Sequence, residues 1–187
     1  MIDAIPLSLS VALPLLVPLL SAAASICLWF YPKVQRVISL CGTVALVIVS
    51  VALFIRVDAL ELVVVQSGNW AAPFGISLVA DLFAAVMVVV SAGFGFTIAL
   101  FSIPDVGVGR KRRGFHPMLH VLLLGVNGAF LTGDLFNLYV WFEVLLIASF
   151  VLVALGGTRE EIEGGLKYVV LNIVSSTFFL ACAGILY

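Results

Sequence analysis

One glutamate, Glu143, lies in the middle of an apolar run that follows Asp134. If Asp134 marks a helix start, Glu143 lies about 13 Å along the axis at 1.5 Å per residue, close to the centre of a hydrocarbon core roughly 30 Å thick. A carboxylate there costs on the order of 3 kcal/mol, so such residues are rare and usually functional. Desolvation favours the neutral acid and a nearby cation favours the charged form. This balance suits a proton-carrying site; the alternative is a glutamate kept neutral by a neighbouring helix for structural reasons.

Two basic residues are further candidates for proton translocation. His120 lies in the preceding apolar run, about one turn inside its predicted cytoplasmic end, and is either a proton relay or a satisfied interfacial histidine. Lys167 opens the last run and either feeds protons toward Glu143 or extends its ammonium to the membrane interface.

Other polar side chains are predicted to support this site. Tyr139 precedes Glu143 by four residues and therefore shares its helical face. Asn172 and Ser176, also four residues apart, are either packing contacts or part of an ion path. Asp134 and Asp81 are predicted to cap helix starts.

Composition identifies an integral membrane protein. Of 187 residues, 64% are hydrophobic and 10% are charged, whereas soluble domains carry about 25% charge. The three cysteines lie inside apolar runs and are not spaced as a metal or redox pair. No phosphate-binding loop, nucleophile elbow or zinc-protease motif occurs, so no cofactor, metal or enzyme active site is predicted.

Six apolar runs are long enough to span a bilayer, which predicts an all-α membrane protein with six transmembrane helices. The runs are residues 5–31, 37–55, 78–101, 117–132, 135–155 and 166–187. Pro14 and Pro18 should kink the first helix without breaking it, because neighbours satisfy carbonyls freed in membrane helices. Pro117 is predicted at the first position of the fourth helix.

The connections are predicted from turn residues. Residues 32–36 form a short turn and residues 156–165 a polar loop. Between the second and third runs, the β-prone segments 62–66 and 74–78 flank turn residues, which indicates a hairpin. An open sheet edge cannot face lipid, so the hairpin lies outside the bilayer.

Basic residues predict the orientation. Eight of the nine Lys and Arg residues follow the first, third and fifth runs, and Arg56 is the exception. The positive-inside rule places those three loops in the cytoplasm, and both termini and the hairpin outside. The cluster Arg110, Lys111, Arg112 and Arg113 is therefore a topology determinant rather than a nucleic-acid patch.

Three segments resemble one protein family. Residues 68–81 (GNWAAPFGISLVAD) are similar to the hairpin segment of the D subunit of the Mrp-type (Mnh, Pha) multisubunit Na+/H+ antiporters. Residues 134–143 resemble the fifth-helix motif of that family and of the antiporter-like subunits of respiratory complex I. The match continues through residues 156–172 and covers essentially the whole chain.

The resemblance implies a fold of two inverted five-helix repeats, with Glu143 as the family's fifth-helix glutamate and a lysine on a later helix as its partner. Residues 1–101 would be three leading helices with a hairpin loop at 57–77, and residues 102–187 the first three helices of the first repeat. The chain is thus expected to be an N-terminal fragment.

Three functions follow as hypotheses. The first is a proton-translocating subunit of a cell-membrane Na+/H+ antiporter, whose partners are the other subunits, the lipid bilayer, protons and monovalent cations. The second is a membrane-arm subunit of an NADH:quinone oxidoreductase or hydrogenase. The third is a membrane scaffold that only docks partner subunits.

Overall fold

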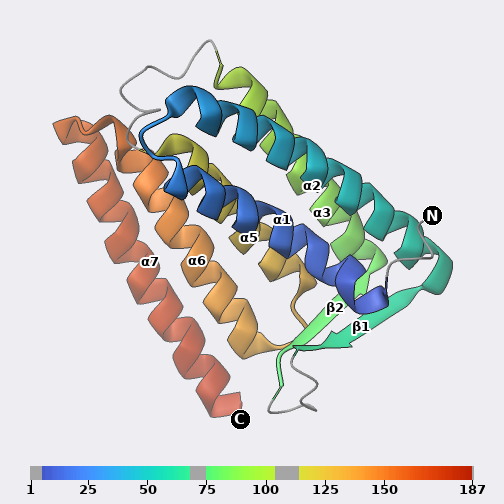
Figure 1. Ribbon diagram of the computed structural model, residues 1–187. Helices are drawn as coiled ribbons and strands as arrows, with labels where there is room; N and C mark the ends of the chain where they lie inside the picture. The colour runs from blue at the N-terminus through green and yellow to red at the C-terminus, as the bar shows by residue number, and fades with distance from the viewer. Residues whose placement is uncertain (1–5, 68–74, 104–113, 187) are drawn as a thin grey trace.

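The computed structural model describes residues 6–67, 75–103 and 114–186, which form a bundle of long helices with a small hairpin at one end (Figure 1). The elements are α1 (Leu7–Cys27), α2 (Pro32–Leu60), β1 (Leu62–Gln66), β2 (Ser77–Asp81), α3 (Leu82–Phe101), α5 (Phe115–Leu131), α6 (Leu135–Val153), the 3₁₀ turn η3 (Ala154–Gly156) and α7 (Arg159–Leu186). Five of the described helices are long and apolar enough to cross a membrane. The sixth, α5, has 17 residues, about 25 Å at 1.5 Å per residue. The prediction of an all-α, six-helix membrane fold is confirmed.

The helices pack in two parts. The helices α1, α2, α3 and α5 surround a common core, α6 packs on α5, and α7 packs on α6 at the edge of the bundle (Figure 1). Within α7, Gly165 is the one buried residue among those the structure describes. The remaining apolar surface of α7 is therefore available to lipid or to additional protein.

The helix α1 continues unbroken through Pro14 and Pro18, as predicted. Pro18 has no N–H, so the Pro14 carbonyl lacks the helical donor four residues later. The side-chain amide of Asn127 on α5 donates to this carbonyl at 3.2 Å. The Asn127 carbonyl oxygen in turn accepts a hydrogen bond from the Ser91 hydroxyl on α3. One buried amide thus joins three helices and satisfies the carbonyl that proline exposes.

The predicted turn at residues 32–36 is wrong, because α2 begins at Pro32. Proline suits the first helical position, where its missing N–H would have had no partner. The predicted end of this helix, at residue 55, is also too early. Arg56 and Val57 continue its buried face, and the helix ends at Leu60, before Glu61, whose φ is +64°. Similarly, α5 begins two residues before Pro117.

The hairpin exists, but the predicted second strand at 74–78 is shifted. The strand β2 is Ser77–Asp81 and pairs antiparallel with β1, so that Leu62 faces Asp81 and Gln66 faces Ser77. Leu78 and Ala80 alternate toward the core, which sets this register. Residues 68–74, including the predicted turn, lie outside the described residues.

The shifted strand also delays the third helix. It begins at Leu82 rather than at residue 78, because the Asp81 carboxylate accepts a hydrogen bond from the Ala84 amide at 2.7 Å. The predicted Asp81 cap is confirmed. The hairpin is held against the α5–α6 turn by the bridge between Leu78 and Thr132 and by a 2.8 Å bond from the Gly133 amide to the Ser77 carbonyl.

The predicted loop at 156–165 is wrong over most of its length, because α7 starts at Arg159. A reciprocal cap explains the early start. The Thr158 hydroxyl accepts from the Glu161 amide at 3.2 Å, and the Glu161 carboxylate accepts from the Thr158 amide at 3.1 Å. This capping box satisfies donors that the first turn leaves free.

The described basic residues gather at one end of the bundle. Lys33, Arg36 and Arg159 lie at the starts of α2 and α7, at the end opposite the hairpin (Figure 1). Arg56 lies near the hairpin end of α2. The cluster at residues 110–113 falls outside the described residues. The orientation of this arrangement relative to the two membrane faces stays a prediction.

Candidate functional site

The helix α6 is positioned by close contact with two glycines of α5. A Cβ added at Gly128 would come within 2.2 Å of the Trp141 ring, and one at Gly125 within 2.7 Å of the Leu145 backbone. Trp141 and Leu145 therefore face α5. Glu143 is two residues from each, about 200° around the helix at 100° per residue. The glycine contacts consequently turn Glu143 away from α5 and toward α7.

Glu143 is half-buried, and one oxygen of its carboxylate is shielded in this position. Its Oε1 atom is buried and has no hydrogen-bond partner among the residues that the structure describes. A buried polar atom without a partner is costly, so this oxygen is a natural place for a proton or a cation to bind.

Glu143 lines a cavity of about 380 Å³ between α6 and α7. Four side chains of α6 form one wall and four of α7 the other: Glu143, Leu146, Ile147 and Phe150 face Tyr168, Val169, Asn172 and Ile173. The wall is apolar apart from Glu143, Asn172 and the Tyr168 phenol. That phenol is hydrogen-bonded to Ser149 at 2.9 Å.

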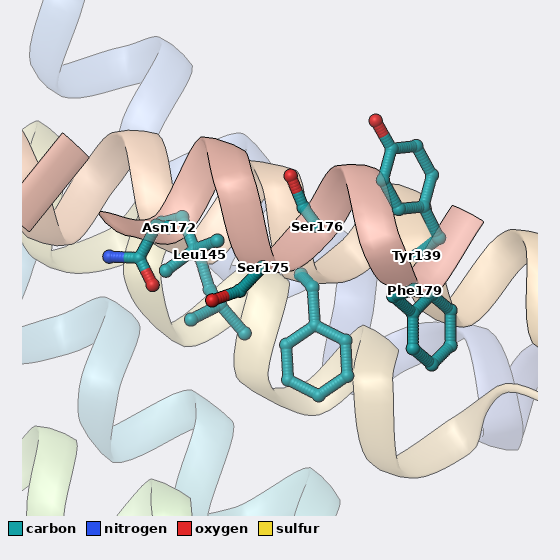
Figure 2. A pocket seen from close by; sticks show the side chains of 8 residues that line it. Tyr139, Leu145, Asn172, Ser175, Ser176 and Phe179 are labelled. Carbon is teal, nitrogen blue, oxygen red and sulfur yellow. The ribbon is translucent and has the colours of Figure 1, made fainter. Parts of the chain in front are cut away.

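A second cavity of about 330 Å³ follows the same helix pair toward the carboxyl end of α7, and Asn172 borders both cavities (Figure 2). Its lining includes Tyr139, Phe142, Leu145 and Leu146 from α6, and Asn172, Ser175, Ser176 and Phe179 from α7. The rings of Tyr139 and Phe179 stack with centroids 6.5 Å apart and planes at 10°. Tyr139 also interacts electrostatically with Glu143.

The structure thus brings four predicted residues together along the α6–α7 seam: Glu143, Tyr139, Asn172 and Ser176. The α7 side chains bond chiefly to their own backbone. The Asn172 amide donates to the Tyr168 carbonyl at 2.9 Å, and the Ser176 hydroxyl to the Ile173 carbonyl at 3.2 Å. The Asn172 carbonyl oxygen is the group that remains available at the cavity.

The remaining predicted residues lie elsewhere. Asp134 caps α6, where its carboxylate accepts from the Asn137 amide at 2.6 Å, so its predicted capping role is confirmed. Lys167 forms an exposed ion pair with Glu163 at 2.8 Å, one turn earlier on α7. His120 is fully buried on the far side of α5, between α1 and α2. Neither Lys167 nor His120 lines the cavity that contains Glu143.

The sequence reasoning missed a set of buried polar side chains in α1 and α2. They are Ser21, Ser25, Gln35, Ser39 and Thr43. The signal was present, because the residues of each helix recur at intervals of four, the spacing of one helix face. Within the described residues, no group of three or more His, Cys, Asp or Glu could hold a metal ion.

Comparison with known proteins places the chain among relatives with this architecture. Residues 132–187 match the family described as "NADH:quinone oxidoreductase/Mrp antiporter, TM". The chain is 44% identical over 177 residues to the D subunit of the Na+/H+ antiporter of Alkalihalophilus pseudofirmus, covering 95% of the chain and 36% of that protein.

Two solved structures are also similar. One is the Mrp complex from Dietzia sp. DQ12-45-1b, with a TM-score of 0.83, 29% identity and coverage of 93% of this chain and 33% of that one. The other is the membrane-bound sulfane sulfur reductase, described as an archaeal respiratory membrane complex. It has a TM-score of 0.83, 30% identity and coverage of 91% of this chain and 35% of that one.

The bundle has the Mrp- and complex I-like fold of multi-pass membrane proteins. Within that class, the predicted similarity to the D subunit of Na+/H+ antiporters is confirmed. The chain spans 36% of the length of the curated antiporter D subunits that it matches.

Proposed function

We propose that this chain is part of a proton-translocating subunit of a multisubunit Na+/H+ antiporter, and that Glu143 carries the proton. The observation that supports this most strongly is that Glu143 lines a cavity while its buried Oε1 atom lacks a hydrogen-bond partner among the described residues. The names of the relatives support the antiporter context. The protein is then a secondary transporter subunit rather than an enzyme.

Glu143 works by exchanging one proton. In the neutral acid an O–H bond removes the charge from the apolar cavity. When a cation approaches, the ionised form becomes favourable and the proton leaves. Asn172 and Tyr168 are the polar groups across the cavity, and they position a proton donor, water or cation near the carboxylate.

The other predicted residues have subsidiary roles in this proposal. Lys167, solvated at the start of α7, delivers protons from the cytoplasmic side. Tyr139 and Ser176 extend the polar seam from Glu143 toward the other end of α7. His120 acts on the opposite side of α5. Asp134 holds the start of α6 and takes no part in proton transfer.

The partners and location follow from the same proposal. The other subunits of the antiporter complex and the surrounding lipid cover the apolar surface of α7, which is exposed in the described residues. The chain lies in the cell membrane with the hairpin and both chain ends outside, and the basic ends of α2 and α7 in the cytoplasm.

The test is Glu143→Gln in the full-length subunit, within the complete antiporter complex. Glutamine keeps the size and hydrogen-bonding capacity but cannot ionise, so cation/H+ exchange should be abolished while the complex still assembles. Glu143→Asp retains the charge with a shorter reach and should keep partial activity. Asp134→Asn is the matched control and should be much milder.

Exchange is measured by dye fluorescence in everted vesicles, and assembly by native gel. Normal exchange by the Gln variant would refute the role of Glu143 in proton transfer. Loss of assembly would assign the residue a structural role.

One alternative has its own support. The likeness to the sulfane sulfur reductase complex is as close in TM-score as that to the Mrp complex, which favours a redox-driven membrane arm as the second candidate. Exchange driven by an imposed Na+ gradient, without any reductant, is expected of the antiporter. Proton movement that requires an electron donor would support the alternative instead.

A further inference from the structure

A second cluster of polar side chains is buried among α1, α2 and α5, on the opposite side of α5 from α6. It lies in the half of the bundle where α1 ends and α2 and α5 begin (Figure 1). His120, Ser25 and Ser39 each have an exposed fraction of 0%. They come from α5, α1 and α2 respectively, so the cluster is enclosed by three helices.

Gly42 allows close packing at the point where these helices meet. A Cβ added at Gly42 would lie 2.2 Å from the Ser21 hydroxyl oxygen and 3.0 Å from Cε1 of His120. The Ser21 side chain and the His120 ring therefore pack at the same point on the backbone of α2. The Ser39 carbonyl also faces the imidazole ring.

Several polar atoms of this cluster are unpartnered. Neither ring nitrogen of His120, nor the hydroxyl oxygens of Ser25 and Ser39, has a hydrogen bond of acceptable geometry within the described part of the chain. Each such group costs about 1–3 kcal/mol when it is buried without a partner. The buried amides of Gln35 and Asn127 do not incur this cost, because they donate to the Ser25 and Pro14 carbonyls.

Water is the partner that these groups fit. A buried water makes two to four hydrogen bonds to polar groups that otherwise lack partners. Here the surrounding groups are hydroxyls and a neutral imidazole, which offers one donor and one acceptor. The described faces of α1 and α2 that border the site contribute serines rather than carboxylates, so a metal cation is a poorer fit.

We propose that His120, with Ser21, Ser25 and Ser39, forms a hydrated proton-binding site that is separate from the Glu143 cavity. The imidazole takes a proton from a hydronium through the bound water, forming one N–H bond as one O–H bond breaks, and returns it by the reverse step. The use of this site as a proton relay to the aqueous phase rests on the proposed proton-translocating function. The hydration of the site does not depend on that function.

The charged and titratable surroundings are simple. On α5 itself, His116 is 1% exposed and close enough to interact electrostatically with His120. The helix α2 has Lys33 and Arg36 in its first turn. The helix α1 presents only Cys27, which is exposed, and Leu82–Phe101 of α3 has no titratable side chain. The titratable Glu143 of α6 faces α7.

The first experiment measures hydration directly on the unmodified full-length subunit in its complex. Deuterium exchange at the histidine Cε1–H, followed by mass spectrometry, reports water access and protonation of each imidazole. His120 should exchange at a rate comparable to that of an exposed histidine and show a titration curve. Exchange that is negligible across the pH range would mean a dry imidazole and would overturn the proposal.

The second experiment disturbs the packing of the site. Gly42→Ala places a methyl group where Ser21 and His120 meet, whereas Gly93→Ala adds one on α3 where nothing lies within 4 Å. The Gly42 variant should slow Cε1–H exchange at His120 by about tenfold or more, because the added methyl group pushes the Ser21 hydroxyl aside and leaves less room for a water beside the imidazole. The Gly93 variant should leave it unchanged. Equal rates in both variants would contradict the proposed site.

Cation/H+ exchange distinguishes this proposal from the preceding one. Gly42→Ala should lower the exchange rate, and Gly93→Ala should not. If Glu143→Gln retains exchange, the role of Glu143 fails, yet the deuterium result still decides the hydration of His120. If Gly42→Ala dries the site without lowering the exchange rate, the relay role of His120 is refuted while that of Glu143 stands.

Discussion

Asn127 should contribute to stability because Pro18 is present, and this dependence can be measured. Pro18 removes the N–H that would bond the Pro14 carbonyl, and the Asn127 amide replaces it at 3.2 Å. Asn127→Leu keeps a similar volume but leaves that carbonyl unsatisfied inside the bundle, where Pro14 and Asn127 are both buried. The expected loss is about 1–2 kcal/mol, in the range found for interhelical hydrogen bonds in membranes.

A double-mutant cycle isolates the effect. Pro18→Ala restores the N–H that the Pro14 carbonyl lacks, so Asn127→Leu should cost less in that background by about 1 kcal/mol, a roughly fivefold change in the folding equilibrium. Ser91→Ala is the matched control. It also removes a hydrogen bond to Asn127, but not the one that proline makes necessary, so its cost should be the same in both backgrounds.

The assay is reversible unfolding of the full-length subunit in mixed micelles with increasing denaturing detergent. The dependence on Pro18 is refuted if Asn127→Leu lowers the free energy of unfolding by the same amount in the native and in the Pro18→Ala background. In that case the amide would stabilise the bundle through Ser91 or through packing alone.

Three further predictions rest on single contacts. In a cysteine-free background, Tyr31→Cys and Glu61→Cys place thiols at opposite ends of α2. A membrane-impermeant maleimide should label the first thiol only from the cytoplasmic side and the second only from outside. The reverse pattern would overturn the predicted orientation. Gly128→Ala should destabilise the α5–α6 contact by about 1–3 kcal/mol, because its methyl group would overlap the Trp141 ring; Gly164→Ala, with open space around it, should be neutral or stabilising in the same unfolding assay. Thr158→Ala should cost about 0.5–2 kcal/mol by removing one half of the α7 cap, whereas an unchanged midpoint would mean that the cap is dispensable.

Much of the fold was predictable because a bilayer imposes simple rules. The apolar runs, the hairpin and the caps at Asp81 and Asp134 follow from hydrophobic length and local hydrogen bonding. Helix ends were harder, since residues with polar or turn-forming side chains can still be helical. Pro32 is the first residue of α2 rather than part of a turn. The helix α7 begins early because Thr158 and Glu161 cap each other.

The candidate site was predictable in part. Two pairs of predicted residues are each about one helical turn apart: Tyr139 and Glu143 on α6, and Asn172 and Ser176 on α7. The antiparallel packing of α6 and α7 brings the two pairs together. The positions of Lys167 and His120 depend on which face of each helix meets which neighbour. Periodicity in a uniformly apolar helix does not specify that choice, because lipid and protein are both apolar surroundings.

The helix α5 explains why the two polar regions stay separate. Its glycine face, at Gly125 and Gly128, lets α6 approach closely enough for Trp141 to lie on the backbone. Its polar face carries His120 and Asn127 against α1, α2 and α3. Both faces belong to one helix, so the backbone of α5 separates Trp141 from the side that carries His120. Close-packed side chains rather than a shared cavity therefore lie between Glu143 and the buried histidine in the described residues.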